Sequence, residues 1–335
     1  MNKRGFLTRI SYTDGLLVAG IIVLILSAIQ DLLFPLGDVQ IPNNHLIKAF
    51  SNVEIGGFLV TDLMQNLFLN HLMRFIYLLG SALLLQFLST EFRLIRVRSN
   101  FPFFFFCVFS ATIIPSLPMS GVSLSCIFFC WAIIRLFKAF DSSDPHKAIF
   151  DASLLITLAS VFQIKLLYLM PVIWLMMVLF RVFNLRSFTS SVLGVLSIFW
   201  IVGGLSFLFG DYVFIKGMLT GSTSFKLINI SEINISELAY MVFLFLLMFS
   251  ALIYFWPKQH LDKLLTRNYL KSIILLWCSL LSLWVFSGND LEFLLYLFSM
   301  SALVVAHFFS LVDTFISRML FILFLIMSLI AYLFL

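Results

Sequence analysis

The sequence predicts an all-α integral membrane protein that crosses the bilayer about eleven times. Hydrophobic residues fill 62% of the 335 positions and charged residues only 11%, and the mean hydropathy is +1.09. Water-soluble globular chains do not reach such an apolar fraction. The apolar runs are continuous and lack the alternation that is typical of a membrane β-barrel. We expect a single membrane domain over residues 1–335.

The residues at the N-terminal end of each of the first two expected spans determine where that span begins. Lys3, Arg4 and Arg9 precede an apolar stretch over 15–34, which has full spanning length and no small-residue cleavage site, so it is expected to be an uncleaved span. The apolar run over 75–88 is shorter than the roughly 20 residues that a spanning helix needs. The second span must therefore extend back through a polar run to residue 62.

The remaining spans are separated by short polar or basic segments. An apolar run over 101–134 is too long for one crossing and carries Pro115 and Pro118 near its middle, which predicts a hairpin. The run over 148–180 is divided in the same way, with a turn at Gln163 to Lys165. The eleven expected spans cover residues 15–34, 62–88, 100–115, 120–138, 148–163, 166–183, 189–210, 237–256, 272–286, 290–311 and 318–335.

The distribution of positive charge predicts the orientation in the membrane. With the N-terminus inside, sixteen of the 21 lysines and arginines lie on the cytoplasmic side. The bias of cytoplasmic loops toward Lys and Arg therefore predicts a bacterial inner-membrane protein with a cytoplasmic N-terminus and a periplasmic C-terminus. The five basic residues left outside or in the membrane are Lys48, Arg74, Lys165, Lys216 and Lys226.

Three extramembrane segments are long enough to be of interest. The expected outer loops cover about 35–61 and 211–236, and the second leads into a tandem Ile-Asn-Ile-Ser-Glu repeat at 228–232 and 233–237. A basic amphipathic segment over about 257–271 is expected to rest on the anionic headgroups of the cytoplasmic leaflet, so membrane lipids are expected partners.

Several functional classes are disfavoured. The chain has no basic tract, zinc-ligand spacing or RNA-binding aromatic signature, which excludes nucleic-acid binding. The four cysteines lie in apolar spans, where a thiol behaves as a small hydrophobe. An ion-coupled transporter is disfavoured because the spans other than the second carry almost no charge. No cofactor is evident, although a loop carboxylate beside a phosphate could hold a divalent cation.

The polar run that begins the second span is the strongest candidate for a site. Its side chains fall within one half of the helix surface, with His71 off to the side. Polar groups at this depth are costly unless they face a cavity or one another. Either they line a polar cavity, or they join helices through interhelical hydrogen bonds. These candidate substrate-binding residues are Asp62, Gln65, Asn66, Asn70 and Arg74.

Two acidic residues near the first outer loop are the candidate catalytic groups. Asp31 or Asp38 could deprotonate an acceptor hydroxyl or bind a divalent cation beside a phosphate. The alternative is that both are ordinary solvated acids of an outer loop. Lys165 could bind the phosphate of a lipid-linked substrate, and its alternative role is to extend toward lipid headgroups.

Two segments resemble an uncharacterised family of polytopic inner-membrane proteins of Bacteroidetes-type bacteria. Residues 150–160, Phe-Asp-Ala-Ser-Leu-Leu-Ile-Thr-Leu-Ala-Ser, are similar to that family's Phe-(Asn/Asp)-Ala-Gly-x-x-x-Gly-x-Ala-Ser segment, with Ser153 and Thr157 in place of its glycines. Residues 179–186, Leu-Phe-Arg-Val-Phe-Asn-Leu-Arg, resemble its Arg-x-Phe-Asn-x-Arg cluster at a cytoplasmic helix end. The resemblance covers about residues 60–210.

The layout of that family is in turn similar to membrane glycosyltransferases that take sugars from polyprenyl-phosphate carriers, the GT-C-like arrangement. The shared features are a large first outer loop, an acidic residue near its start, and a small-residue helix that leads to a membrane-embedded proline, here Pro171. The resemblance implies a catalytic role for Asp31 or Asp38 and a polyprenyl-phosphate-linked sugar as substrate. The paired-acid signature of many such enzymes is absent, so a non-catalytic scaffold or subunit of a larger envelope complex is the alternative.

Overall fold

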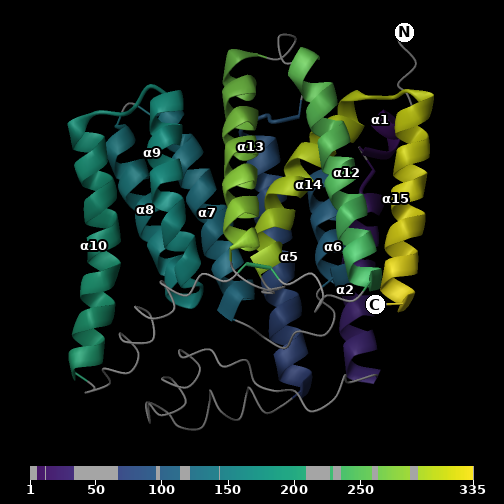
Figure 1. The fold of residues 1–335 in the computed structure, drawn as a ribbon, viewed down its shortest axis with the longest axis horizontal. Coiled ribbons are helices and arrows are strands. Elements are labelled where there is room, and N and C mark those ends of the chain that lie inside the picture. Colours follow the sequence, from purple (N-terminus) through teal and green to yellow (C-terminus); the bar gives the residue numbers. More distant parts are fainter. Residues whose placement is uncertain are drawn as a thin grey trace.

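The computed structural model describes residues 6–11, 13–33, 67–95, 99–113, 121–142, 144–208, 227–228, 235–258, 263–286 and 293–334. Over these residues the chain is a bundle of helices without a strand (Figure 1). The elements are α1 (Phe6–Ser11), α2 (Gly15–Leu33), α5 (Leu67–Glu91), α6 (Phe101–Ile113), α7 (Gly121–Asp141), α8 (Pro145–Phe162), η1 (Ile164–Leu169), α9 (Met170–Leu179), α10 (Leu185–Leu208), α12 (Ile235–Lys258), α13 (Leu264–Val285), α14 (Leu294–Leu311) and α15 (Phe315–Phe334).

The helices confirm the predicted class of a multi-spanning α-helical membrane protein. Seven are long and apolar enough to cross a membrane, and three shorter apolar helices cover Gly15–Ile29, Phe101–Thr112 and Ile164–Leu179. Each expected span corresponds to a helix, with α8 at the fifth and η1 with α9 at the sixth. Large apolar side chains such as Trp200 and Ile253 remain 84% and 72% exposed, as expected where lipid is the solvent.

One end of the bundle, which we call the basic end, gathers the starts of α2, α6, α8, α10, α13 and α15 and the ends of α5, α7, α9, α12 and α14 (Figure 1). Asn100 N donates to Ser11 O at 2.9 Å, and His307 Nδ1 lies 3.0 Å from Leu94 O. The rings of Phe92 and Phe137 are 5.4 Å apart. The lysines and arginines with described side chains here are Arg93, Arg135, Lys138, Lys147, Arg181, Arg186, Lys263, Arg267, Lys271 and Arg318.

The opposite end holds the other helix ends. Tyr296, near the start of α14, donates to Ser125 near the start of α7 at 2.8 Å, and Ser125 donates to Ala159 O near the end of α8 at 2.9 Å. Helices α6 and α7 therefore run in opposite directions, as the predicted hairpin requires, although Pro115 lies outside the described residues. The chain alternates between the two ends, so that α2 begins at the basic end and α15 finishes at the other (Figure 1).

The start of α13 differs from the expectation for the basic amphipathic segment. Leu264–Lys271 forms the first two turns of α13 and is not a separate surface segment. Tyr269 and Leu270 are buried while Lys263 is exposed, because one face of these turns packs into the bundle and the other carries the cations. The apolar run of this span begins only after the cations, near residue 272, but the helix already begins at Leu264.

Helix α14 is the centre of the bundle. Every residue from Leu294 to Ser310 is buried, and α6, α12 and α13 surround it. Phenylalanine rings fill the contact with α6 and α15, where the ring of Phe105 lies 5.5 Å from that of Phe309 and 5.2 Å from that of Phe324. A helix that is apolar all round is expected to lie in the interior of such a bundle.

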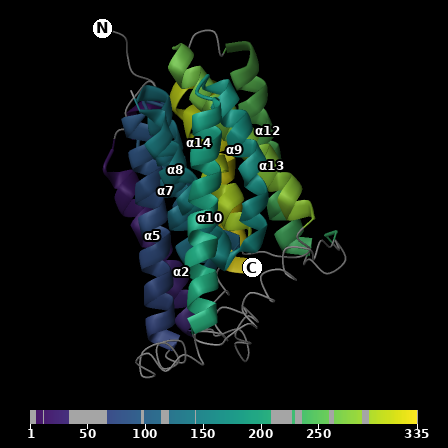
Figure 2. The same ribbon diagram turned by 90° about the vertical axis from the view of Figure 1, so that its left-hand side faces the viewer.

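Helix α10 lies at one side and packs mainly against α8 (Figure 2). The two helices approach closely at Gly194, where an added Cβ would lie 2.7 Å from Phe150 O and 3.0 Å from Ser153 Cβ. Ser153 donates to Ser191 at 3.0 Å, and Trp174 Nε1 donates to the same hydroxyl at 3.1 Å. The glycine on α10 therefore allows the close approach of the two helices at Ser153.

Candidate functional site

A cleft between α2 and α5 contains two basic side chains in apolar surroundings. Arg74 is only 5% exposed and His71 only 7%. The empty volume is about 220 Å³, which includes space open to the outside. The cleft lies in the half of the bundle opposite the basic end. Its lining residues are Leu24, Ser27, Ala28, His71, Arg74, Phe75 and Leu78.

Helical spacing places these residues together. Phe75 and Leu78 lie four and seven residues after His71, and Arg74 lies three after it, which puts all four on one face of α5. Arg74 is seven residues from the start of α5, or about 10 Å along the axis. Ser27 faces it from α2 and donates to Leu24 O at 3.0 Å, so its oxygen keeps its capacity to accept a hydrogen bond.

A guanidinium at this depth favours an anionic group. Arginine stays charged in proteins and presents a planar set of donors that matches carboxylate and phosphate oxygens. Burying such a charge is costly unless charged or hydrogen-bonding groups surround it. The lining of the cleft therefore combines one permanent cation and one imidazole with mostly apolar side chains.

The structure describes the predicted site residues to different extents. Arg74 lines the cleft. For Asp31 and Asn70 the backbone is described, in α2 and α5, but not the side chain. The other candidates Asp38, Asp62, Gln65 and Asn66 lie outside the described residues.

Lys165 does not join this cleft. It is half-buried in η1, which packs against α8, α9 and α13, whereas the cleft is formed by α2 and α5. Its position after Gln163, where the chain turns back at the end of α8, accounts for the separation. Lys165 and Arg74 are thus on different elements of the non-basic end.

Two residues of the cleft were not selected from the sequence. His71 was expected to lie beside the polar face, yet it lines the same cleft as Arg74. The three-residue interval between them was the available signal. Ser27 carried no signal, because its position depends on how α2 is rotated against α5. Among residues with described side chains, no three His, Cys, Asp or Glu lie together as metal ligands.

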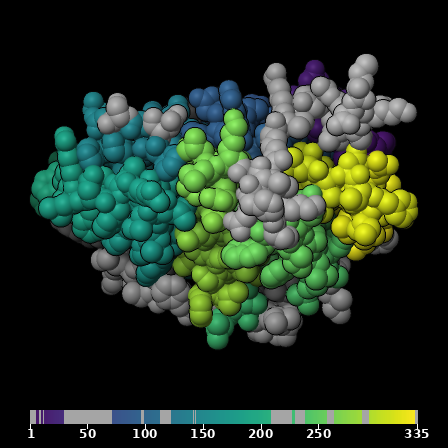
Figure 3. All heavy atoms as spheres, turned by 90° about the horizontal axis from the view of Figure 1, so that it is seen from above, coloured from purple at the N-terminus to yellow at the C-terminus, as the bar shows by residue number. Residues whose placement is uncertain are grey.

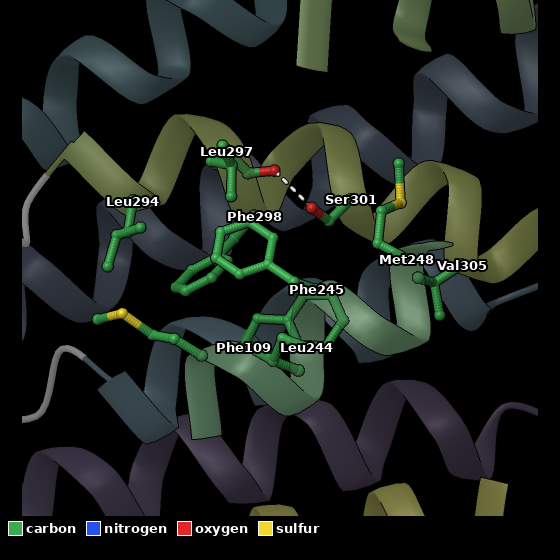
Figure 4. A pocket seen from close by; sticks show the side chains of 10 residues that line it. Phe109, Leu244, Phe245, Met248, Leu294, Leu297, Phe298, Ser301 and Val305 are labelled. Carbon is green, nitrogen blue, oxygen red and sulfur yellow. Dashed lines mark hydrogen bonds between the residues drawn. The ribbon is translucent and has the colours of Figure 1, made fainter. Parts of the chain in front are cut away.

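A second hollow lies between α6, α12 and α14 and is lined almost entirely by apolar side chains (Figure 4). Its empty volume is about 350 Å³. The one polar lining residue is Ser301, which donates to Leu297 O at 2.9 Å and accepts from Trp277 Nε1 at 2.8 Å. Because this hydroxyl is engaged, the hollow offers packing space and no reactive group.

Comparison with known proteins adds no relative. No family model, curated protein or solved structure matches the chain.

Proposed function

We propose that this multi-spanning membrane protein binds the phosphate of a lipid-linked sugar in the cleft between α2 and α5 and transfers the sugar to an envelope acceptor. The observation that carries the proposal is the burial of Arg74 and His71 together, in the half of the bundle opposite the basic end. We place the protein in a bacterial inner membrane with its basic end in the cytoplasm, so that the cleft belongs to the periplasmic half.

The chemistry of the cleft matches such a substrate in two respects. The Arg74 guanidinium suits phosphate oxygens. Leu24, Phe75 and Leu78 give the apolar wall that an isoprenoid chain needs beside its phosphate. Both groups of a polyprenyl-phosphate-linked sugar would therefore find complementary surfaces within one cleft.

In the proposed transfer, the bond between the sugar carbon and the phosphate oxygen breaks and a bond from the acceptor oxygen to that carbon forms. The acceptor hydroxyl proton passes to a carboxylate, and the phosphate leaves with the bonding electrons, held by Arg74. Asp31 is the first candidate for the carboxylate because it follows Ser27 by one turn of α2. Asp38 is the second, and either could instead hold a divalent cation against the phosphate.

The Arg74→Gln variant tests this role. We expect loss of most transfer while the amount of folded protein in membranes stays near normal, because the amide keeps a polar group in place but removes the charge. The readouts are protein abundance and the envelope glycan profile of the same cells. Arg186→Gln removes one exposed arginine at the start of α10 and should change neither. Reduced abundance without a glycan defect in the surviving protein would contradict the proposal.

A non-catalytic membrane subunit is the alternative, and the narrowness of the cleft favours it. The empty volume of about 220 Å³ includes space open to the outside, so the enclosed part of the cleft is smaller than the roughly 300–1,000 Å³ of typical ligand pockets. In that case Arg74 joins helices, and its replacement would destabilise the fold by roughly 1–3 kcal/mol by leaving a buried polar group without its partner. Loss of abundance that parallels any phenotype is the outcome expected for this alternative.

A further inference from the structure

Five aromatic rings form a cluster at the basic end, which we call the aromatic plug. Neighbouring rings have centroids 4.6 to 5.9 Å apart. The plug joins four elements: the end of α5, the end of α7, the end of α9 and the start of α13. Its members are Phe92, Phe137, Phe140, Phe180 and Tyr269.

Five cations stand beside the plug, and we call them the collar: Arg93, Lys138, Arg181, Arg267 and Lys271. Each is one or two positions from a plug residue in the chain. None of them is ion-paired with a side chain that the structure describes. Other cations of the basic end do pair: Arg135 with Asp151 at 3.7 Å, Lys147 with Asp144 at 3.6 Å and Arg318 with Asp313 at 2.6 Å.

Two of the collar arginines occupy left-handed backbone positions. Arg93 has φ 47° and Arg181 φ 59°, and they are the two non-glycine residues with positive φ within the described ranges. Each follows a helix end at which a backbone bond closes the last turn, from Leu94 N to Ser89 O at 3.1 Å and from Val182 N to Met177 O at 3.0 Å. Glycine is the favoured residue at this position, so an arginine here costs stability.

Arg267 adds an unsatisfied donor. Its Nε is fully buried and has no hydrogen-bond acceptor among the described groups. A buried charged donor without an acceptor is costly. Among the described residues, this donor is thus available to an acceptor on a ligand bound at the basic end.

The net charge of the collar and its surroundings indicates how much negative charge a ligand there would carry. Against five unit positive charges stand two acidic residues at the ends of α5 and α7, Glu91 and Asp141, and about half a negative charge at the C-terminal end of each of three helices. The start of α13 contributes about half a positive charge in the same approximation. The collar thus keeps about two positive charges. The general excess of cations in cytoplasmic loops does not explain why they gather beside one cluster of rings.

We propose that the collar binds the headgroup of an anionic phospholipid with two phosphates, of the cardiolipin type, in the leaflet at the basic end. Arginine and lysine donors contact the phosphates, and the plug closes the four-helix end beneath them. The end-on view shows the elongated outline of this face, from the α8–α10 side to α15 (Figure 3). The collar lies at the other end of the bundle from the cleft between α2 and α5, so the two proposals fail independently.

The test compares two triple variants of the full chain in phosphatidylcholine nanodiscs with and without cardiolipin. Lys138→Gln, Arg181→Gln and Arg267→Gln remove three collar charges. The matched control, Lys147→Gln, Arg186→Gln and Arg318→Gln, removes three charges from the same end but outside the collar. Native mass spectrometry measures the lipid retained, and the thermal unfolding midpoint reports the stabilisation that binding gives.

We expect the wild type and the control to retain cardiolipin and to unfold at higher temperature in its presence. The collar variant should retain roughly tenfold less, since each charge-assisted bond lost weakens binding severalfold or more. If it does not fold, the milder Lys138→Gln, Lys271→Gln pair takes its place. Equal loss in the control, or no cardiolipin effect in the wild type, would overturn the proposal.

Two further arms identify the ligand. Phosphatidylglycerol, with one phosphate, should give a smaller shift in the unfolding midpoint than cardiolipin at equal phosphate content. An equal shift would overturn the assignment to two phosphates. Inorganic phosphate added to phosphatidylcholine nanodiscs should give no shift, and a shift as large as that of cardiolipin would show a site for soluble anions instead of a lipid.

Discussion

Single hydroxyls connect helices that are distant in the chain. The buried Tyr240 of α12 has its hydroxyl oxygen 3.1 Å from Thr112 Oγ1 on α6 and 3.0 Å from Ser328 Oγ on α15. Hydrogen bonds between membrane helices contribute about 0.6 kcal/mol each on average. The two bonds of Tyr240 therefore help to hold three helices at the non-basic end.

Replacing this tyrosine tests the contribution. We expect Tyr240→Phe to lower the free energy of unfolding by about 1 kcal/mol, since it removes two interhelical bonds and keeps the ring. Titration with a denaturing detergent, followed by circular dichroism, gives the value. Tyr77→Phe is the control, because the Tyr77 hydroxyl makes no hydrogen bond with a described residue. A loss in Tyr240→Phe no larger than in this control would contradict the role.

For single residues, the sequence indicated which side chains were of chemical interest but not which residues they contact. Arg74 was selected as part of the polar run at the head of the second span, and in the structure it lines a cleft. The sequence shows no partner for His307, and in the structure its Nδ1 lies 3.0 Å from Leu94 O, 213 positions away. Such long-range contacts depend on helix rotation, which composition and periodicity leave open.

At the scale of elements, the contact between α8 and α10 depends on the absence of a side chain at one position. An alanine Cβ at 194 would lie 2.7 Å from Phe150 O, too close for either backbone to stay in place. Gly203, on the same helix, has no neighbouring atom within 4 Å of an added Cβ. The two glycines are thus a matched pair on one helix.

The pair gives opposite predictions. Gly194→Ala should destabilise the bundle by roughly 1–3 kcal/mol, as overpacking does. Gly203→Ala should be neutral or stabilising by up to about 1 kcal/mol, because alanine favours the helix. Unfolding in denaturing detergent measures both variants. Equal effects at the two positions would show that the α8–α10 contact is looser than described.

Element types were predictable here, and element limits were less so. Continuous apolar runs predicted a helix at every span, because a chain in lipid must satisfy its backbone internally. Helices α10 and α13 nevertheless begin earlier than expected, at Leu185 and Leu264 instead of 189 and 272. Polar first turns lower the hydropathy of a segment without ending its helix.

For the whole molecule, the arrangement of charge and the direction of the helices agree. The described cations outside the basic end are Arg74 and Lys165. The alternation of helices between the two ends was derivable from the sequence because positive charge marks the connections on one side and each span has a limited length. The packing order, with α14 at the centre, was not derivable, since every span is apolar enough to occupy that place.

Reporter fusions at Asp144 and Leu335 test whether this chain spans the membrane an odd number of times with its basic end in the cytoplasm. Each fusion carries, in separate strains, alkaline phosphatase, which is active only outside the cytoplasm, or a fluorescent protein that folds only inside. We expect fluorescence and no phosphatase activity at Asp144, and phosphatase activity without fluorescence at Leu335. The same reporter active at both sites would contradict the eleven-span topology, and with it the assignment of the Arg74 cleft to the periplasmic half.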